Sequence, residues 1–319
     1  MTRRDPGKQA SSDAPATRRS GFTGFARRRP LTAFLLLALG IGWPVLAIPA
    51  IIGAPGEPFL LLLVYVGLLA PALIVTRAVG GPGAIRRLLS RVLIWRFSIV
   101  RWAVILFGVP VLTVALSAAF GTLESPEGGW LGVLGTYLFA TLVFPALVIN
   151  LWEETAWAGF AQTRLMARHG LLVGSLLTAL PFAAIHIPLQ FTGDWTWSEA
   201  GIGLALVFGI APFSRYLLGM HLLDTGGSVL AAAIQHASWN AAGNLDGVGG
   251  DYESIAATAL LTVLLAVGRR LWRPESRPIG REAEKAAAAE WTTPAVRDPG
   301  SGVQTRVRRA GGPTVDRDV

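Results

Sequence analysis

Two adjacent glutamates, Glu153 and Glu154, stand in a run from Leu147 to Phe160 that is otherwise apolar enough to lie in a bilayer. A carboxylate at membrane depth costs several kcal/mol, and two neighbouring charges also repel each other. A purely structural role would need a partner that compensates for this cost. The pair therefore predicts a site within the membrane that performs chemistry or moves an ion.

Two of the four histidines lie deep in other apolar segments and can face the glutamates. His186 follows the run 181–185, and His236 lies in the segment 234–240. His236 and Asn240 are four residues apart, so they share one face of a helix. Glu153 and Glu154 are ~100° apart around their helix, so both can border one cavity without pointing at the same atom.

Glutamate and histidine around a cavity form a set that can activate water. A carboxylate takes a proton from water as general base, and a histidine orients that water or acts as an acid. The amide of Asn240 can donate to the oxyanion that develops when water attacks a peptide carbonyl. The catalytic candidates are therefore Glu153, Glu154, His186, His236 and Asn240.

A metal centre is an open alternative for the same residues. Glu153, His186 and His236 can hold a divalent metal such as zinc and leave a fourth position for water. Taken singly, each histidine has an equally ordinary role as a hydrogen-bonding partner between helices, and for Asn240 alone that role is the favoured one. The prediction of a site rests on all five residues together. His169 and His221 fall in predicted loops and are not expected to be catalytic, and Trp152 and Trp157 are expected to wall the cavity.

The composition shows what must position these residues. Of the 319 residues, 52% are hydrophobic and 15% are charged, and the mean hydropathy is +0.50. Soluble domains are about a quarter charged, so this balance predicts a multi-pass membrane protein. The absence of cysteine excludes disulfides, thiolate catalysis and cysteine-bound zinc. The net charge of +8 comes from arginines in tails and short connections, a distribution that indicates membrane topology and not a nucleic-acid partner.

The chain is predicted to be an all-α bundle of about eight transmembrane helices. Residues 1–29 and 274–319 are expected to be disordered, and 30–273 to form the membrane domain. The fourth span is long for one crossing, and Pro145 is expected to break it. Residues 88–96 resemble an amphipathic helix on the membrane surface. The predicted spans are 31–52, 58–76, 102–121, 130–163, 171–188, 199–218, 227–243 and 253–269.

Charge asymmetry between the connections orients the bundle. Connections 53–57, 122–129, 189–198 and 244–252 contain no lysine or arginine, whereas the other connections contain arginine or, between the sixth and seventh spans, follow Arg215. The positive-inside rule places the arginine-bearing connections and both termini in the cytoplasm, with the cell membrane as the expected location. Arg215 is counted among these topology markers, at the end of the sixth span.

Depth along each helix gives a consistency check at ~1.5 Å per residue. Counted from Arg164, the glutamates lie ~15 Å into the membrane. Counted from Gly226, His236 lies ~15 Å in and Asn240 ~21 Å in. His186 comes out at ~24 Å, which is too deep for an upright helix, so we expect a tilt or a later start of that span.

The three motifs together resemble those of the CPBP family, which contains the CAAX prenyl endopeptidases of the Rce1 type and the bacterial Abi proteins. The motifs are Glu153-Glu154, Phe182-x-x-x-His186 and His236-x-x-x-Asn240, in this order on separate spans. The resemblance covers about residues 145–243. It implies an intramembrane endopeptidase, sometimes described as a metalloprotease, whose general base corresponds to Glu153 and its partner to His186. Glu154, His236 and Asn240 would complete the site and stabilise the oxyanion.

One position departs from the family pattern. The family's first motif carries an arginine four residues after the second glutamate, and here that residue is Ala158. Three arrangements would compensate: one glutamate is protonated, a metal neutralises the pair, or another cation takes the arginine's place. Arg164 is ten positions beyond Glu154, nearly three turns away, and is a poor substitute. The departure also allows altered or lost activity.

Two other classes of protein fit part of the pattern. A proton-coupled transporter, or an immunity or scaffold factor, would use the glutamates and histidines as a proton relay. Inverted repeats would favour transport, but residues 31–121 and 171–269 show no convincing similarity. His186 and His236 as axial haem ligands is a third reading, against which the adjacent carboxylates argue. For the protease, the expected partners are the lipid bilayer and a peptide or protein substrate, with a prenylated substrate left open.

Overall fold

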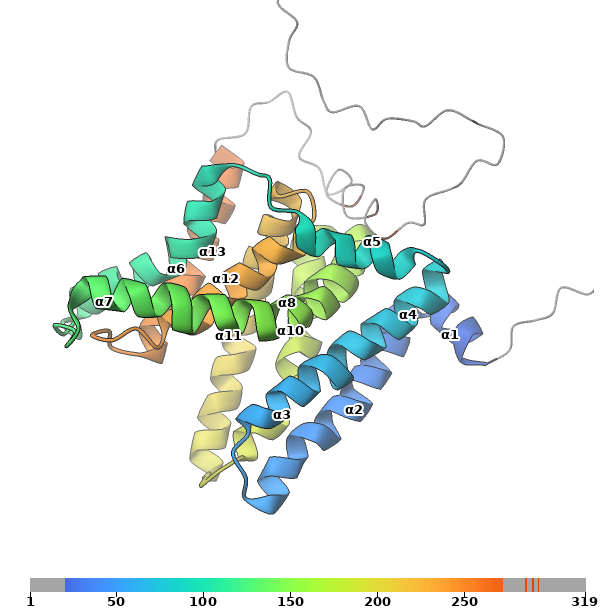
Figure 1. The fold of residues 1–319 in the computed structure, drawn as a ribbon, viewed down its shortest axis with the longest axis horizontal. Helices are drawn as coiled ribbons and strands as arrows, with labels where there is room; N and C mark the ends of the chain where they lie inside the picture. Colours follow the sequence, from blue (N-terminus) through green and yellow to red (C-terminus); the bar gives the residue numbers. More distant parts are fainter. Residues whose placement is uncertain (1–20, 272–284, 286–288, 290–291, 293–319) are drawn as a thin grey trace, which may run out of the picture.

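The computed structural model of the chain describes residues 21–271 together with Lys285, Ala289 and Thr292. This part consists of helices and contains no strand, so the prediction of an all-α fold is confirmed. The helices form one bundle around α12 (Figure 1). In chain order, the first helices are α1 Phe22–Arg28, α2 Pro30–Ile52, α3 Glu57–Leu62, α4 Ala70–Gly80, α5 Ala84–Ser90 and α6 Ile99–Phe120. The later ones are α7 Gly129–Thr136, α8 Leu151–Glu154, α9 Thr163–His169, α10 Leu171–Ile185, α11 Trp197–Asp224, α12 Val229–Ala242 and α13 Asp251–Leu271.

Six helices of the described part are long and apolar enough to cross a membrane. They are Pro30–Ile52, Pro58–Gly80, Ile99–Phe120, Leu171–Phe191, Trp197–Asp224 and Tyr252–Leu271. Each coincides with one of the eight predicted spans. The other two predicted spans, 130–163 and 227–243, correspond to a long helical run and to α12. Eight crossings and cytoplasmic termini stay predictions.

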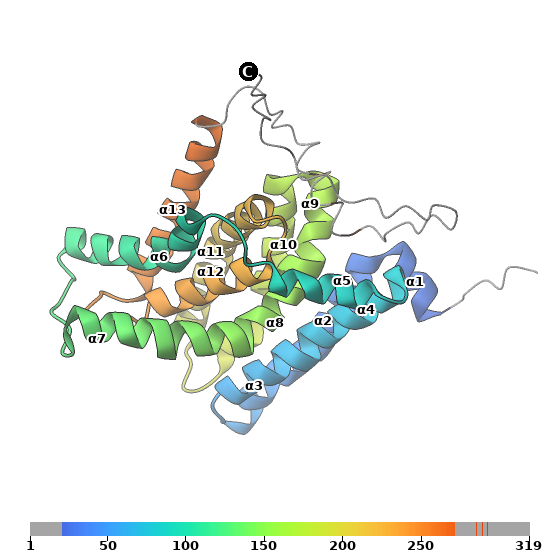
Figure 2. The same cartoon turned by 45° about the horizontal axis from the view of Figure 1, so that its top comes forward.

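The helical run from Gly129 to His169 continues through the position where a break at Pro145 was expected. π-helical turns occupy Tyr137–Val143, Ala146–Asn150 and Thr155–Gln162 along this run. Wider turns on both sides of Pro145 accommodate the missing N–H and the proline ring, which is why the helix continues through this position. The run lies across the direction of α11 in both ribbon views (Figures 1 and 2).

Helix α12 is short because protein, and not lipid, surrounds it. It has 14 residues, and its alanines Ala231, Ala232, Ala233, Ala237, Ala241 and Ala242 are all buried. Small side chains let neighbouring helices approach closely on every side. Its N-terminus is capped by the Ser228 side chain, which accepts a hydrogen bond from the N–H of Ala231. This central, capped helix carries His236.

Small residues also set the contact of α10 with its neighbours. A Cβ atom added at Gly174 would lie 2.6 Å from the backbone nitrogen of Met166 in α9. One added at Gly219 in α11 would lie 2.6 Å from Leu171 and 2.7 Å from the hydroxyl of Ser175 in α10. Glycine at these two positions is therefore what allows α9, α10 and α11 to pack at this distance.

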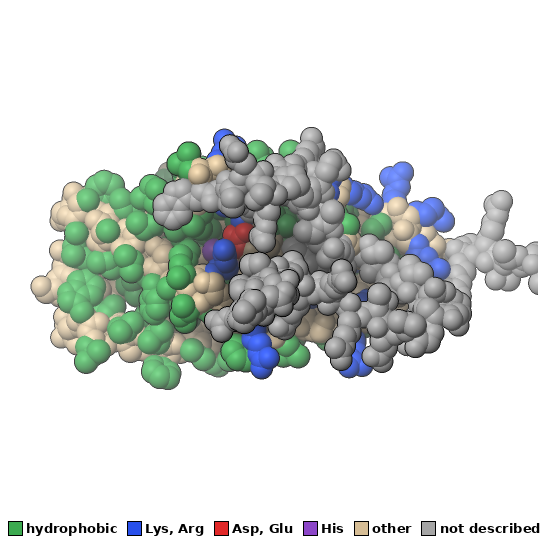
Figure 3. Space-filling model, turned by 90° about the horizontal axis from the view of Figure 1, so that it is seen from above, with side chains coloured by type: hydrophobic (Ala, Val, Ile, Leu, Met, Phe, Trp, Pro, Cys, Tyr) green, Lys and Arg blue, Asp and Glu red, His purple; other side chains and the backbone are tan. Residues whose placement is uncertain are grey.

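The bundle has two faces that differ in charge. One face, which we call the arginine face, consists of helix α5 and the C-terminal ends of α1, α4, α9, α11 and α13. The opposite face, which we call the arginine-free face, consists of the connections 53–56, 121–128, 192–196 and 243–250. On the arginine face, Asp224 at the end of α11 pairs with Arg101 of α6 at 2.6 Å and with Arg269 of α13. Figure 3 looks down on this face, where lysine and arginine side chains are visible at several places.

Two further local predictions are corrected. Residues 22–28 form helix α1, whose Arg27 donates to the carbonyl of Ala78, so the predicted disordered arm is ordered from Phe22 onward. The amphipathic segment predicted at 88–96 begins earlier, at Ala84, and its helical part ends at Leu93. The rest of the predicted arm and tail, residues 1–20 and most of 274–319, lies outside the described residues.

Candidate active site

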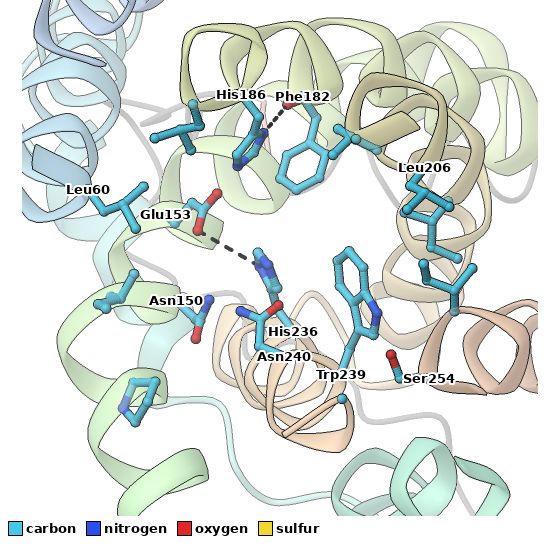
Figure 4. A pocket seen from close by; sticks show the side chains of 18 of the residues that line it. Leu60, Asn150, Glu153, Phe182, His186, Leu206, His236, Trp239, Asn240 and Ser254 are labelled. Carbon is cyan, nitrogen blue, oxygen red and sulfur yellow. Dashed lines mark hydrogen bonds and ion pairs between the residues drawn. The ribbon is translucent and has the colours of Figure 1, made fainter. Parts of the chain in front are cut away.

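Four of the five predicted catalytic residues meet at one cavity of about 550 Å³, and Glu154 is the exception. Glu153 comes from α8, His186 from the C-terminal cap of α10, and His236 and Asn240 from α12. Figure 4 shows these side chains pointing toward a common space, with Phe182 and Trp239 beside the histidines. His186, whose predicted depth was inconsistent with the others, does line the same cavity as Glu153.

Glu154 points away from this cavity into a fully buried ion pair. Its two carboxylate oxygens accept hydrogen bonds from Arg215 of α11, at 2.8 Å from Nη1 and 2.5 Å from Nη2. Both side chains are 0% exposed. Glu154 also accepts from Nδ1 of His236 at 2.8 Å. A buried carboxylate held by a bidentate guanidinium and a third donor is stable in its charged form.

Arg215 is the functional residue that the sequence interpretation missed. It was taken as a cytoplasmic marker at the end of a span, but α11 continues nine residues beyond it to Asp224 and buries it. Its guanidinium carbon also lies 3.9 Å from the centroid of the Phe182 ring. Of the three arrangements expected to compensate for Ala158, the structure therefore contains the substitute cation. The signal was present in the sequence as an arginine within a long apolar segment.

Glu153 has different surroundings from its neighbour. It is 6% exposed, lines the cavity, and forms no hydrogen bond with the described side chains. Nδ1 of His236 lies 4.0 Å from Oε2 of Glu153. One glutamate is thus fixed in an ion pair, and the other is an unengaged carboxylate at the inner end of the cavity.

Hydrogen bonds define the tautomers of both histidines. Nδ1 of His186 lies 2.7 Å from the carbonyl oxygen of Phe182, and Nδ1 of His236 lies 2.8 Å from a carboxylate oxygen of Glu154. Because these oxygens only accept, Nδ1 is the protonated nitrogen in each ring. In a neutral ring, Nε2 is then left with a lone pair that can accept a proton or a hydrogen bond from water.

Aromatic rings hold the histidines in place. The Phe182 ring makes edge contacts with His186 at 5.0 Å and with His236 at 5.9 Å between centroids. The ring of Trp239 stacks on His236 at 5.7 Å. The phenylalanine of the second motif thus supports Arg215, His186 and His236 at once.

The remaining predictions about aromatic residues and histidines have mixed outcomes. Trp157 is 0% exposed and packs against Phe34 and Phe182, so it belongs to the core, and neither it nor Trp152 lines the cavity. His221, predicted in a loop, is buried in α11 and lies 3.1 Å from the side-chain oxygen of Gln235. His169 is the last residue of α9.

A second arginine fixes the two helices that carry the site. Arg91, just after α5, donates from Nε to the carbonyl of Gly227 and from Nη1 to the carbonyl of Gly159, both at 2.8 Å. These carbonyls lie before α12 and within the helical run that carries the glutamates. Burial, with a smaller effect of the nearby Arg164, lowers the pKa of Arg91 to about 9, so its charge is retained at neutral pH.

The side chains proposed as metal ligands do not form a ready metal site. Within the described residues, no group of three or more histidine, aspartate or glutamate side chains is arranged to hold an ion. Glu153, His186 and His236 border one cavity, but Nδ1 of each histidine is already engaged. The divalent metal stays a prediction.

Fold and site together define a multi-pass membrane protein with a buried glutamate and histidine centre. Residues 134–242 match the sequence model of the family described as "Type II CAAX prenyl endopeptidase Rce1-like". The matched segment begins in α7 and ends with α12, and so contains all five predicted catalytic residues. The matched segment is therefore similar to the Rce1-like family, which is the resemblance that the motifs predicted. A comparison with curated proteins gives no match.

Proposed function

We propose that the protein is an intramembrane endopeptidase that hydrolyses peptide bonds with water activated by Glu153. The observation that carries this proposal is that an unengaged carboxylate and two oriented histidines border one cavity. The similarity to the Rce1-like family supports the same class of reaction.

The surroundings of each residue suggest its role. Glu153 takes a proton from water, and Nε2 of His186 accepts a second hydrogen bond from that water and orients it. The hydroxide that forms attacks the carbonyl carbon of the substrate. Asn240 donates to the oxyanion, and the protonated Glu153 then passes its proton to the leaving amine. Glu154 remains charged throughout, since Arg215 and His236 hold it.

Cleavage of a peptide panel by the purified protein in detergent tests this proposal. Glu153→Gln preserves the shape of the side chain but removes the base, so it should lower kcat by about 10²–10⁴-fold. His186→Ala should have a comparable effect, while both variants still insert into the membrane. Full activity of both purified variants would contradict the mechanism.

The same assay separates the remaining alternatives. Parallel reactions with and without a chelator determine whether a divalent metal such as zinc is required. Peptides with and without a prenylated cysteine determine whether the substrate is of the CAAX type. Wild-type protein that cleaves no member of the panel, while it carries protons across vesicles, would favour the proton-relay alternative.

A further inference from the structure

The cavity beside Glu153 extends in one direction only. On α12 the exposure rises from buried His236 through half-buried Trp239 to exposed Asn240, and Asn244, just beyond the end of α12, is exposed as well. In the opposite direction along α12, Ala232 is fully buried. The cavity therefore opens toward the arginine-free face.

The residues that line the cavity from the other helices also lie toward the arginine-free face. In α11 the lining residues are Gly203, Leu206, Val207 and Ile210, all in the half that begins on the arginine-free face. In α13 they are Ser254 and Ile255, at its arginine-free end. Toward the arginine face the site is closed by the Glu154–Arg215 pair and by Trp157 and Phe160, which are all 0% exposed.

The lining also indicates what the cavity accepts. Its walls are mostly apolar and include many aliphatic side chains, and amide side chains of Asn150, Gln190, Asn240 and Asn244 are set among them. Aliphatic walls suit apolar side chains, whereas amides can both donate to and accept from a peptide backbone. Asn150 is 1% exposed, and its side-chain oxygen has no hydrogen-bond partner among the described residues. It lies three residues before Glu153, on the same side of the helix (Figure 4).

We propose that an extended, apolar peptide segment enters this cavity from the arginine-free face, and that Asn150 accepts a hydrogen bond from its backbone beside the bond to be cleaved. This inference rests on the proposed hydrolysis for its substrate, but the direction of access stands on the geometry alone. By the positive-inside rule the arginine-free face is the non-cytoplasmic one, so the substrate is a polypeptide that reaches the membrane from that side.

Accessibility labelling tests the direction of access. The chain contains no cysteine, so single cysteines can be introduced without a background thiol. Asn244→Cys and Leu206→Cys report on the cavity, and Arg86→Cys, exposed on α5, reports on the arginine face. Val111→Cys, 61% exposed on an apolar stretch of α6, is the lipid-facing control. Each variant is treated with a charged, membrane-impermeant maleimide in right-side-out and in inverted vesicles.

The expected result is that both cavity cysteines are labelled from the side opposite to Arg86→Cys, while Val111→Cys is labelled from neither. Labelling of the cavity cysteines from the same side as Arg86→Cys, or from neither side, would overturn the proposal. Denaturation followed by labelling verifies that each variant is present. This readout needs no activity, so it stays decisive even if no peptide is cleaved.

A second measurement tests the role of Asn150. Against an internally quenched apolar peptide, Asn150→Leu should lower kcat/KM by ~10-fold, the value of one lost hydrogen bond. Peptides methylated at each backbone nitrogen in turn identify the N–H that Asn150 engages. Methylation of that nitrogen should lower kcat/KM of the wild-type enzyme by ~10-fold and should not lower kcat/KM of Asn150→Leu any further. If Asn150 had a purely structural role, the losses of kcat/KM caused by the substitution and by methylation would be additive at every peptide position. That outcome would overturn the assignment of Asn150.

Discussion

At the scale of single residues, two neighbouring glutamates differ because of what lies opposite each. Glu154 meets a guanidinium from another helix, whereas Glu153 meets open space. The family pattern places the counter-charge one turn along the same helix, and here Ala158 holds that position. In this chain α11 provides the positive charge through Arg215. We conclude that the ion pair is retained although its arginine occupies a different helix.

The relocation predicts that the two positions are interchangeable. Arg215→Met leaves the buried Glu154 charge with His236 alone, which should cost about 3–5 kcal/mol of stability and at least 10²-fold in cleavage. Ala158 is four residues after Glu154 and therefore lies on the same helical face. Arg215→Met combined with Ala158→Arg should restore most of both losses, as measured by thermal unfolding in detergent and by peptide cleavage.

Ala158→Arg alone is the matched control for this exchange. Ala158 is 0% exposed, so a second buried guanidinium has neither space nor a free carboxylate, and this variant should be less stable than wild type. A folded double variant that cleaves no better than Arg215→Met would show that a cation on α11 is not equivalent to one on the glutamate helix.

At the scale of elements, the helices are held by contacts at their ends as well as by their apolar faces. Arg91 joins the start of α12 to the helix that carries the glutamates, and the Ser228 hydroxyl donates to the carbonyl of Ile94 at 2.6 Å. The surface segment from α5 to Ile94 therefore fixes the separation of the two helices that present Glu153 and His236.

Arg91→Met should show this effect. The substitution removes two hydrogen bonds to buried carbonyls, each worth about 1.5–3 kcal/mol when the donor is charged. We expect a lower melting temperature and a fall in kcat, because His236 and Glu153 lose their fixed separation. Arg86→Met is the control, since Arg86 is exposed on α5, the helix that precedes Arg91. Equal melting temperatures for the two variants would exclude a clamping role for Arg91.

The close contact of α9 and α10 gives another prediction for an element. Gly174→Ala places a methyl group 2.6 Å from backbone atoms that cannot rotate away, so it should separate α10 from α9 and lower stability by about 1–3 kcal/mol. Gly40→Ala, in α2, meets no atom within 4 Å and should be neutral or stabilising. Thermal unfolding of both variants measures the difference, and equal values would contradict the steric argument.

The elements were more predictable from sequence than their contacts. Hydropathy located all six membrane-length helices because ~20 apolar residues are required for any upright crossing. The predicted break at Pro145 was wrong, because π-helical turns beside a proline let the helix continue and leave no signal in the hydropathy. Hydropathy also misjudged Arg215, because an arginine near a predicted span end has the same composition whether it faces water or a carboxylate on another helix. The three motifs identified the candidate residues, but only tertiary packing distinguishes Glu153 from Glu154.

At the scale of the whole molecule, the two faces have different roles. The arginine face is closed and cross-linked, since Asp224 joins the ends of α6, α11 and α13 through Arg101 and Arg269. On the arginine-free face, connections 121–128 and 243–250 contact each other through the N–H of Glu124 and the carbonyl of Gly247, and the cavity opens beside them. The stabilising ion pairs and the opening of the cavity thus lie at opposite ends of the same helices.

This division predicts that the ion pairs of Asp224 with Arg101 and Arg269 on the arginine face affect stability and not substrate binding. Asp224→Asn leaves Arg101 and Arg269 facing each other without a carboxylate, which should cost about 1 kcal/mol or more for a partly exposed network. The cavity lies at the other end of α11, so KM for a peptide substrate should stay unchanged.

The matched control is Asp246→Asn on the arginine-free face. Asp246 accepts a hydrogen bond from the N–H of Glu127 at 3.2 Å. The substitution should leave the melting temperature nearly unchanged, because that contact is exposed. A raised KM with an unchanged melting temperature in Asp224→Asn would mean that substrate approaches from the arginine face, and the separation of the two roles would be wrong.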